Sequence, residues 1–242
     1  MTVKAPRYLL REDAVLGCLR KQLPGKFLEI GFGNGNFLLT LEKLGYNGLA
    51  YDRSAQVRML GSKLLSANNI TAIELVDEMP VAETFSYIFF FEVLGYLENP
   101  SIFLESLKGQ VQKGGKVIFS FTNIRHQGDA EKYSGNMACF SRQEVLEILK
   151  NAGYKAEIFI NYGYPLSNLL RPLLHRHYKK RNKSGKQDTV ENSGLVYSDS
   201  GFQWGSLLIN RFTVFPFLLL QRLFRNTDLG TGYIVVASRL DD

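Results

Sequence analysis

The chain has 242 residues, 45% of them hydrophobic and 12% aromatic, which suffices for one large domain or two small ones and excludes disorder throughout. Its two cysteines, Cys18 and Cys139, allow neither a disulfide framework nor a four-cysteine zinc site, so a reducing compartment is expected. The charged N-terminal residues do not resemble a signal peptide, and the longest apolar run, 212–220, is about half the ~20 residues that span a bilayer. We expect a cytoplasmic protein, with peripheral membrane association left open.

The net charge of +6 is concentrated in one segment. Residues 171–186 contain no acid, and their basic residues are Arg171, Arg176, Lys179, Lys180, Arg181, Lys183 and Lys186. Without these seven charges the rest of the chain carries about −1, so the basicity does not describe the main body. The segment is either a solvated loop or a patch that contacts phosphate groups or a membrane surface.

From residue 26 onward, short β-type runs alternate with segments of helical periodicity, which is typical of crossover units in a parallel sheet. Three of the intervening helices have clear start signals, namely Ser54, Asn99 followed by Pro100, and Ser141 paired with Glu144. In the helix that Ser54 starts, the predicted apolar stripe consists of Val57, Leu60 and Leu64. The predicted strands are 26–30, 47–52, 70–76, 86–91, 113–121, 156–160 and 231–239.

The alternation stops between the last two predicted strands, over residues 161–230. The pattern there predicts a helix around 162–174, a polar loop over 179–200, and a second apolar segment over 207–224 that Pro216 bends. We interpret 161–230 as a helical and loop insertion that caps the substrate site within a single domain, 1–242. Its apolar side chains either close the pocket or reach a membrane.

A glycine-rich turn, LEIGFGNGNF, connects the first predicted strand to the first helix and contains Gly31, Gly33 and Gly35. Glycines at this place allow a tight turn and let a ligand approach backbone N–H groups at the start of a helix. Asp52 ends the next strand, where its carboxylate can accept hydrogen bonds from both hydroxyls of a ribose. The combination predicts a ligand that contains a nucleoside.

The spacing of the glycines identifies a family. A dinucleotide fingerprint, GxGxxG, would need a glycine where Asn36 stands, and the chain has GxGxG instead. Together with Glu29, two residues before Gly31, the turn resembles the first motif of class I S-adenosylmethionine-dependent methyltransferases. Segments 91–100 and 113–117 resemble the family's segment after strand four and its turn into strand five. The resemblance covers about residues 24–160 and the last strand.

The resemblance implies an α/β, Rossmann-like fold. Its seven-stranded, mostly parallel sheet would have helices on both faces, strand order 3-2-1-4-5-7-6 and an antiparallel last strand preceded by the insertion. The cofactor, S-adenosyl-L-methionine, would lie across the carboxyl ends of strands one and two. The implied contacts are Gly31, Gly33 and Gly35 to the methionine and ribose portion, Glu29 to the loop or the amino group, Asp52 to the ribose, Arg53 beside the adenine, and Asp77 to the adenine amino group.

Candidate catalytic residues follow the fourth and fifth predicted strands. Methyl transfer from a sulfonium is an in-line displacement that positioning and desolvation can accelerate, so a general base is optional. Related small-molecule enzymes often read EVLEH after strand four, whereas this chain reads EVLGY, which puts a histidine-dependent mechanism at this position in doubt. Glu92 and Tyr96 remain pocket candidates, and His126 is a candidate base in the loop after strand five. No metal site is expected.

These observations favour methyl transfer to a small molecule, a sugar or a lipid-linked intermediate. A non-catalytic module with the same fold, docking a partner or an anionic membrane, is the alternative, and an NAD-dependent oxidoreductase is a weaker one. We expect no nucleic-acid substrate, because the chain lacks the Asn/Asp-Pro-Pro-aromatic tetrapeptide of many amino-methylating members.

Overall fold

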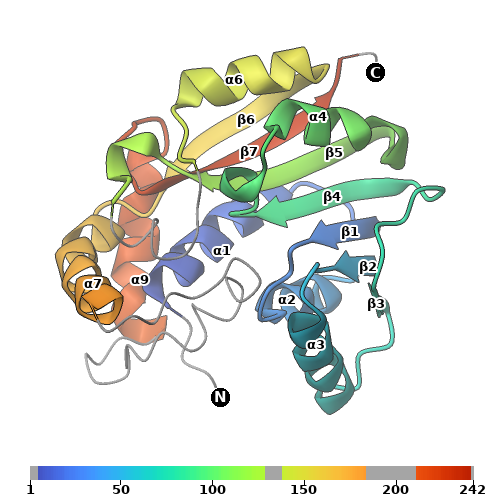
Figure 1. Ribbon diagram of the computed structural model, residues 1–242, viewed down its shortest axis with the longest axis horizontal. Coiled ribbons are helices and arrows are strands. Elements are labelled where there is room, and N and C mark those ends of the chain that lie inside the picture. The colour runs from blue at the N-terminus through green and yellow to red at the C-terminus, as the bar shows by residue number, and fades with distance from the viewer. Residues whose placement is uncertain (1–4, 129–137, 184–210, 241–242) are drawn as a thin grey trace.

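A computed structural model describes residues 5–128, 138–183 and 211–240. Its sheet has seven strands in the order β3-β2-β1-β4-β5-β7-β6 (Figure 1). Neighbouring strands from β3 to β5 run parallel, and β7 is antiparallel to both β5 and β6. The predicted fold class, strand order and antiparallel last strand are confirmed. The strands are β1 (Lys26–Ile30), β2 (Asn47–Tyr51), β3 (Ile73–Val76), β4 (Phe85–Phe91), β5 (Val111–Thr122), β6 (Tyr154–Tyr162) and β7 (Gly232–Arg239).

Helices cover both faces of the sheet, and each face has its own buried apolar cluster (Figure 1). Helices α1, α2, α3, α7 and α9 contribute to one cluster, and α4 and α6 to the other. Because side chains alternate along a strand, each buried strand supplies both clusters. The helices are α1 (Pro6–Leu19), α2 (Asn36–Lys43), α3 (Ala55–Ala67), α4 (Pro100–Ser106), α6 (Arg142–Asn151), α7 (Leu166–Lys183) and α9 (Arg211–Leu220).

The three predicted helix starts are all present as side-chain caps. Ser54 Oγ accepts a hydrogen bond from the N–H of Val57, and Asn99 Oδ1 accepts one from the N–H of Ile102. Ser141 and Glu144 form a capping box at the start of α6. Each cap satisfies backbone N–H groups that lack a partner within the helix, so these boundaries could be located from the sequence.

The predicted apolar stripe of α3 is confirmed at Val57 and wrong at Leu60. The buried residues of this helix are Val57, Gly61 and Leu65, whereas Leu60 is 42% exposed. Gly61 sets this face, since a Cβ at this position would come within 2.7 Å of the Phe32 ring. The missing side chain lets the helix pack closely, and a glycine adds nothing to a hydrophobic pattern.

Helix α1 was not predicted, although it packs against the sheet beside β6, β7 and α9. Its buried residues recur at helical spacing and comprise Pro6, Leu10, Ala14, Val15, Cys18 and Leu19. Pro6 stands in the first turn, where a missing N–H removes no helical hydrogen bond. The charged residues between these positions interrupt the apolar pattern in the sequence, so the helix was not predicted.

The insertion differs from its prediction in the basic segment. Helix α7 continues to Lys183, so the loop predicted from Lys179 is wrong for residues 179–183, because Lys and Arg are good helix formers. The rest of that loop, 184–200, and the start of the second apolar segment lie outside the described residues. Pro216 lies within α9.

A buried glutamine attaches the insertion to α1. Gln221, which follows α9 and is 2% exposed, accepts a hydrogen bond from the N–H of Gly163. Its Nε2 donates to the carbonyl of Leu10 and to Asp13 Oδ2, each at 3.1 Å. Arg222 adds an ion pair to the same aspartate, at 2.6 Å. The end of β6, the helix α1 and the insertion therefore share one polar contact.

Gln221→Leu should destabilise the protein by about 1–3 kcal/mol, because it leaves buried polar partners unsatisfied. The matched control is Gln56→Leu on the exposed surface of α3, which should change stability by less than about 0.5 kcal/mol. Urea unfolding of both variants measures the difference. Equal stabilities for the two variants would contradict the proposed attachment.

Candidate functional site

The candidate site lies at the carboxyl edge of the parallel strands, where open α/β sheets bind their ligands. The glycine turn follows β1, Asp52 follows β2, Asp77 follows β3 and Glu92 follows β4. Val76 pairs with Tyr51, so Asp77 and Asp52 are neighbours along this edge. The residues that the sequence predicts to bind the methyl donor lie at or beside these strand ends.

The glycine turn requires its glycines. Gly31, Gly33 and Gly35 have φ values of 73°, 56° and 70°, in the left-handed region that other residues rarely adopt. A Cβ at Gly31 would also lie 2.8 Å from Val93, and one at Gly35 would lie 2.8 Å from Leu64. The turn is therefore closely packed as well as left-handed, and α2 begins directly after it.

Asp52 is 8% exposed, and its carboxylate fastens the glycine turn to the end of β2. Oδ2 accepts from the N–H of Gly33 at 3.2 Å, and Oδ1 accepts from the N–H of Ser54 at 3.0 Å. Burial raises the pKa of Asp52 above its ordinary value. The two hydrogen bonds and the nearby charges of Arg53 and Arg58 act to lower this pKa, but burial outweighs them. Each oxygen retains acceptor capacity, because a carboxylate oxygen can accept two hydrogen bonds.

Glu29 is an acid on an otherwise apolar face of β1. It is 2% exposed, and its Oε2 is buried without a hydrogen-bond partner. Burial raises the pKa of Glu29 to about 8; the charge of Arg11 acts in the opposite direction, and that of Asp52 adds to the rise. A buried acceptor without a partner is costly, so this atom indicates a missing donor.

Glu92, by contrast, has partners for both carboxylate oxygens. Oε1 accepts from the hydroxyls of Ser120 and Tyr162, at 2.9 and 2.8 Å. Oε2 accepts from Arg7 Nη2 at 3.0 Å and from the hydroxyl of Thr122 at 2.9 Å.

The charge of Glu92 follows from these contacts. Burial acts to raise its pKa, but Arg7, Arg11 and the hydroxyl donors outweigh burial and hold the pKa below its ordinary value. An ionised carboxylate with four donors favours an anchoring role over proton abstraction.

The remaining candidates lie in separate places. Tyr96 ends a short 3-10 helix, Leu94–Tyr96, and is partly buried. His126 Nε2 lies 3.2 Å from the carbonyl oxygen of Leu229, in the loop that precedes β7. Arg53 and Asp77 are exposed.

Two arginines of α1 and Tyr162 at the end of β6 also lie at this edge and were not predicted from the sequence. Arg7 reaches Glu92 and Thr122, and Arg11 lies one turn further along the same side of the helix. The guanidinium carbon of Arg11 is 5.4 Å from the centre of the Tyr8 ring and 5.2 Å from that of Phe91. Once residues 6–19 are recognised as a helix, the four-residue spacing of Arg7 and Arg11 indicates that both lie on the same side of it.

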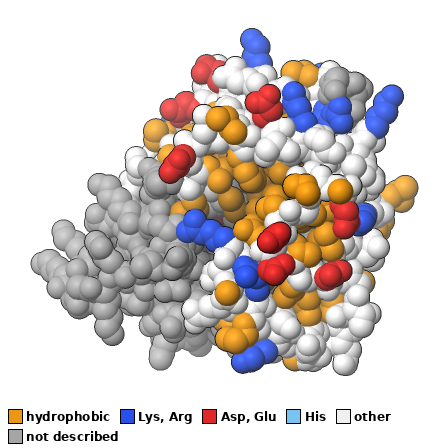
Figure 2. Space-filling view, turned by 45° about the vertical axis from the view of Figure 1, so that its right-hand side comes forward, with side chains coloured by type: hydrophobic (Ala, Val, Ile, Leu, Met, Phe, Trp, Pro, Cys, Tyr) orange, Lys and Arg blue, Asp and Glu red, His pale blue; other side chains and the backbone are white. Residues whose placement is uncertain are grey.

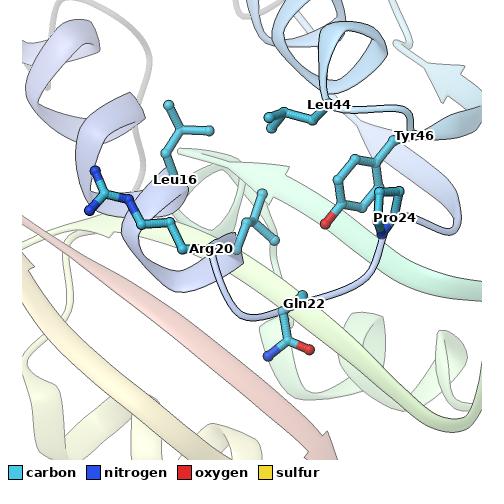
Figure 3. Close-up of a pocket in the computed structure, with 7 residues that line it drawn as sticks. Leu16, Arg20, Gln22, Pro24, Leu44 and Tyr46 are labelled. Atoms are coloured by element: carbon cyan, nitrogen blue, oxygen red, sulfur yellow. The ribbon is translucent and has the colours of Figure 1, made fainter.

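A cavity of about 390 Å³ lies at the opposite edge of the sheet, near the end of α1 (Figure 3). It is lined by Leu16, Leu19, Arg20, Gln22, Pro24, Leu44 and Tyr46. None of the predicted site residues is among them. In the view turned toward this edge, apolar side chains gather at the centre of the surface and charged ones surround them (Figure 2).

Comparison with known proteins identifies the family. Residues 4–157 match the methyltransferase domain family, and the chain belongs to it. A similar sequence is an uncharacterized methyltransferase of Alkaliphilus oremlandii, 26% identical over 170 residues that cover 65% of this chain and 76% of the relative.

Solved structures with the same fold agree. A putative methyltransferase of Bacillus halodurans has a TM-score of 0.59 at 14% identity and covers 95% of this chain and 99% of its own. A SAM-dependent methyltransferase of Aquifex aeolicus has a TM-score of 0.53 at 20% identity, over 64% of this chain and 85% of its own. The protein is thus a class I methyltransferase. More particularly, it is an enzyme whose methyl donor is S-adenosyl-L-methionine.

The elevated pKa of Glu29 leads to a test by pH. An ordinary glutamate ionises near 4.5, whereas folded Glu29 stays protonated up to about 8. Between these values the folded state binds the extra proton, so wild-type stability should fall by about 1.4 kcal/mol per pH unit from this group. Glu29→Gln removes this slope, and its stability relative to wild type should rise over the same window.

Urea unfolding at about pH 5, 6.5 and 8 would measure the slope in both proteins. Arg11 and Asp52, the charged groups that face Glu29, remain in the variant. Glu74→Gln, at an exposed acid of β3, is the matched control and should follow the wild type. Parallel profiles for wild type and Glu29→Gln would mean that Glu29 is not a buried, protonated acid.

Proposed function

We propose that this enzyme transfers the methyl group of S-adenosyl-L-methionine to a small-molecule acceptor at the carboxyl edge of the sheet. The observation that carries the proposal is the Asp52 carboxylate, held by the turn at Gly33 and by Ser54 with acceptor capacity left on both oxygens. A ribose diol has the two hydroxyl donors that would fill it. The unpartnered Oε2 of Glu29, two residues before the turn, supports a cationic or donor group of the ligand at its side.

In this proposal the donor-binding residues lie along one edge. Gly31, Gly33 and Gly35 would bring the backbone close to the ligand, which their positive φ values and missing side chains support. Arg53 and Asp77 flank the adenine from the ends of β2 and β3, where their exposed side chains are available.

The acceptor would approach from the side of β4 and β5. The bound donor supplies an electrophilic methyl group with a good leaving group, so the protein has to position the acceptor and exclude water. Glu92 would hold Arg7, Ser120, Thr122 and Tyr162 in place through its four hydrogen bonds. Tyr96 would line the pocket, and His126 would serve as a base for acceptors that need one.

Asp52→Ala should weaken the binding of S-adenosylhomocysteine by about 1–3 kcal/mol, because charge-assisted hydrogen bonds to the ribose are lost. Titration calorimetry of wild type and variant would measure this loss. Glu74→Ala, an exposed acid on the neighbouring strand β3, is the matched control and should bind like the wild type. An unchanged dissociation constant for Asp52→Ala would reject the ribose contact, and tight binding of NAD alone would reject the whole proposal.

We further propose that the acceptor is lipid-linked, on the evidence of the insertion. On α9 and the turn after it, Val214 is buried, whereas Phe215 is 55% and Leu223 is 77% exposed. One side thus packs inward, as a pocket-closing cap requires, and the other presents large apolar side chains to solvent. The described helices include none that is long and apolar enough to cross a membrane. Exposed apolar residues together with the basic residues of α7 suit an interfacial contact with anionic lipid.

Wild-type protein should then sediment with anionic vesicles at low salt. Each basic residue near the surface contributes on the order of 1 kcal/mol, screened over about 8–10 Å, so changing Lys179, Lys180, Arg181 and Lys183 to Ser should weaken binding and its salt dependence. Phe215→Ser with Leu223→Ser should remove the part that salt does not affect.

Ile102→Ser is the matched control for the apolar contact, because Ile102 is 62% exposed on the opposite face of the sheet. Its vesicle binding should equal that of the wild type. Equal, negligible sedimentation of wild type with anionic and neutral vesicles would refute the membrane contact and leave a freely soluble acceptor.

A further inference from the structure

The cavity at the amino ends of the strands is separate from the candidate site (Figure 3). It lies where two helices end, because Leu16 and Leu19 belong to the end of α1, and Leu44 directly follows α2. Pro24 and Tyr46, which precede β1 and β2, complete a mostly apolar wall. Its volume of about 390 Å³ is within the range of sites that bind small molecules, and such sites combine apolar walls with a few polar groups.

Tyr46 supplies a buried polar atom to this cavity. The residue is 3% exposed, and its hydroxyl points toward the other lining residues (Figure 3). Its ring packs edge-on against that of Tyr87, at 5.3 Å between the ring centres, but the Tyr87 hydroxyl donates its hydrogen bond to the carbonyl of Leu23. Among the described residues, the Tyr46 hydroxyl has no hydrogen-bond partner. A buried hydroxyl without a partner is costly, so this atom indicates a missing acceptor.

The rim of the cavity is basic. Arg20 lines it, Lys21 follows in the sequence, and Lys43 lies in the last turn of α2; all three side chains are exposed. In the part of the chain that the structure describes, none of the three forms an ion pair or a side-chain hydrogen bond. Residues 16–25 contain no acid that could neutralise them. The charge of this rim therefore favours an anionic ligand.

We propose that this cavity is a second ligand site of the enzyme and that its ligand is a small apolar carboxylate. The apolar body packs against the three leucines and Pro24. The carboxylate accepts the hydrogen bond of the Tyr46 hydroxyl and faces Arg20, whose exposed side chain can turn over the rim. A carboxylate suits both the buried donor and the basic rim, whereas a neutral or cationic head suits at most one of them. The site uses none of the residues assigned to the methyl donor or the acceptor, so it does not rest on the proposed function.

Titration calorimetry with octanoate, octanol and octylammonium tests the head group, because the three probes share one alkyl chain. Wild-type protein should bind octanoate most tightly, octanol roughly 3- to 10-fold more weakly, and octylammonium more weakly still. Hexanoate tests the apolar wall. Each methylene group removed from the carboxylate probe should weaken binding roughly fourfold, because less apolar surface is buried.

Two conservative variants test the polar contacts. Tyr46→Phe keeps the ring and should weaken octanoate binding roughly 3- to 10-fold, because the buried donor is lost. Arg20→Gln should weaken it roughly two- to fivefold, since solvent screens a contact at the rim. Tyr154→Phe, a buried tyrosine of the other apolar cluster, and Lys63→Gln, an exposed lysine of α3, are the matched controls and should bind octanoate like the wild type. Thermal unfolding of each variant confirms that it folds.

Two further variants exclude other occupants and other places. Leu44→Asp puts a negative charge at the 42% exposed rim position and should abolish octanoate binding. Phe215→Ser, on the exposed side of α9, should leave octanoate binding unchanged. Sedimentation velocity of wild type and Leu44→Asp reports whether a second copy of the chain covers the cavity instead.

Selective loss of octanoate in Tyr46→Phe and Arg20→Gln, with both controls unchanged, supports the second site. Wild type that binds no octanoate, or that binds octanol equally well, overturns it. So does unchanged octanoate binding in either variant, or its loss in Phe215→Ser. A wild-type dimer that Leu44→Asp dissociates gives the cavity to a second copy and also overturns the proposal. Because the two sites share no residue, none of these outcomes bears on the proposed function.

Discussion

The carboxylate of Glu92 is the contact on which the arrangement of the carboxyl edge depends. Its donors come from three elements, namely Arg7 of α1, Ser120 and Thr122 of β5, and Tyr162 of β6. Glu92 itself follows β4 with a φ of 60°, which turns the chain out of the strand. Removing one partner from such a network leaves the others unsatisfied, so these four elements are fixed relative to one another.

Helix α1 contacts the Glu92 network at its start and the insertion further along, so its position affects both parts of the site. Arg7 anchors its start, and one turn later the helix presents Arg11 toward the side of β1 that carries Glu29. Further along, Asp13 and the carbonyl of Leu10 receive the side chain of Gln221, so the insertion is attached to the same helix. The donor side and the acceptor side therefore meet at α1. A change in the docking of this helix would alter both, which gives the N-terminal segment a role beyond packing.

Much of the fold could be predicted because local signals were unambiguous. The bounds of β1 and the caps at Ser54 and Ser141 depend on neighbouring residues alone, and the strand order followed from the family resemblance. The burial of Gly61 in α3 could not be predicted, because a glycine adds nothing to a hydrophobic pattern. The hydrogen-bond partners of Glu92 could not be predicted either, because they lie 28 to 85 residues away in the sequence. The sequence predicted its position after β4 and favoured a place in the pocket. The four hydrogen bonds of its carboxylate favour an anchoring role instead.

The central claim is that the methyl donor binds along the carboxyl edge, at the glycine turn and Asp52. A crystal structure of the wild-type protein with S-adenosylhomocysteine tests it most directly. The account predicts the ribose hydroxyls on Asp52 and a donor group of the ligand beside the unpartnered Oε2 of Glu29. A ligand in the cavity at the opposite edge, lined by Leu16, Pro24 and Tyr46, would contradict the account, and so would a ligand at the carboxyl edge that leaves Asp52 without a contact.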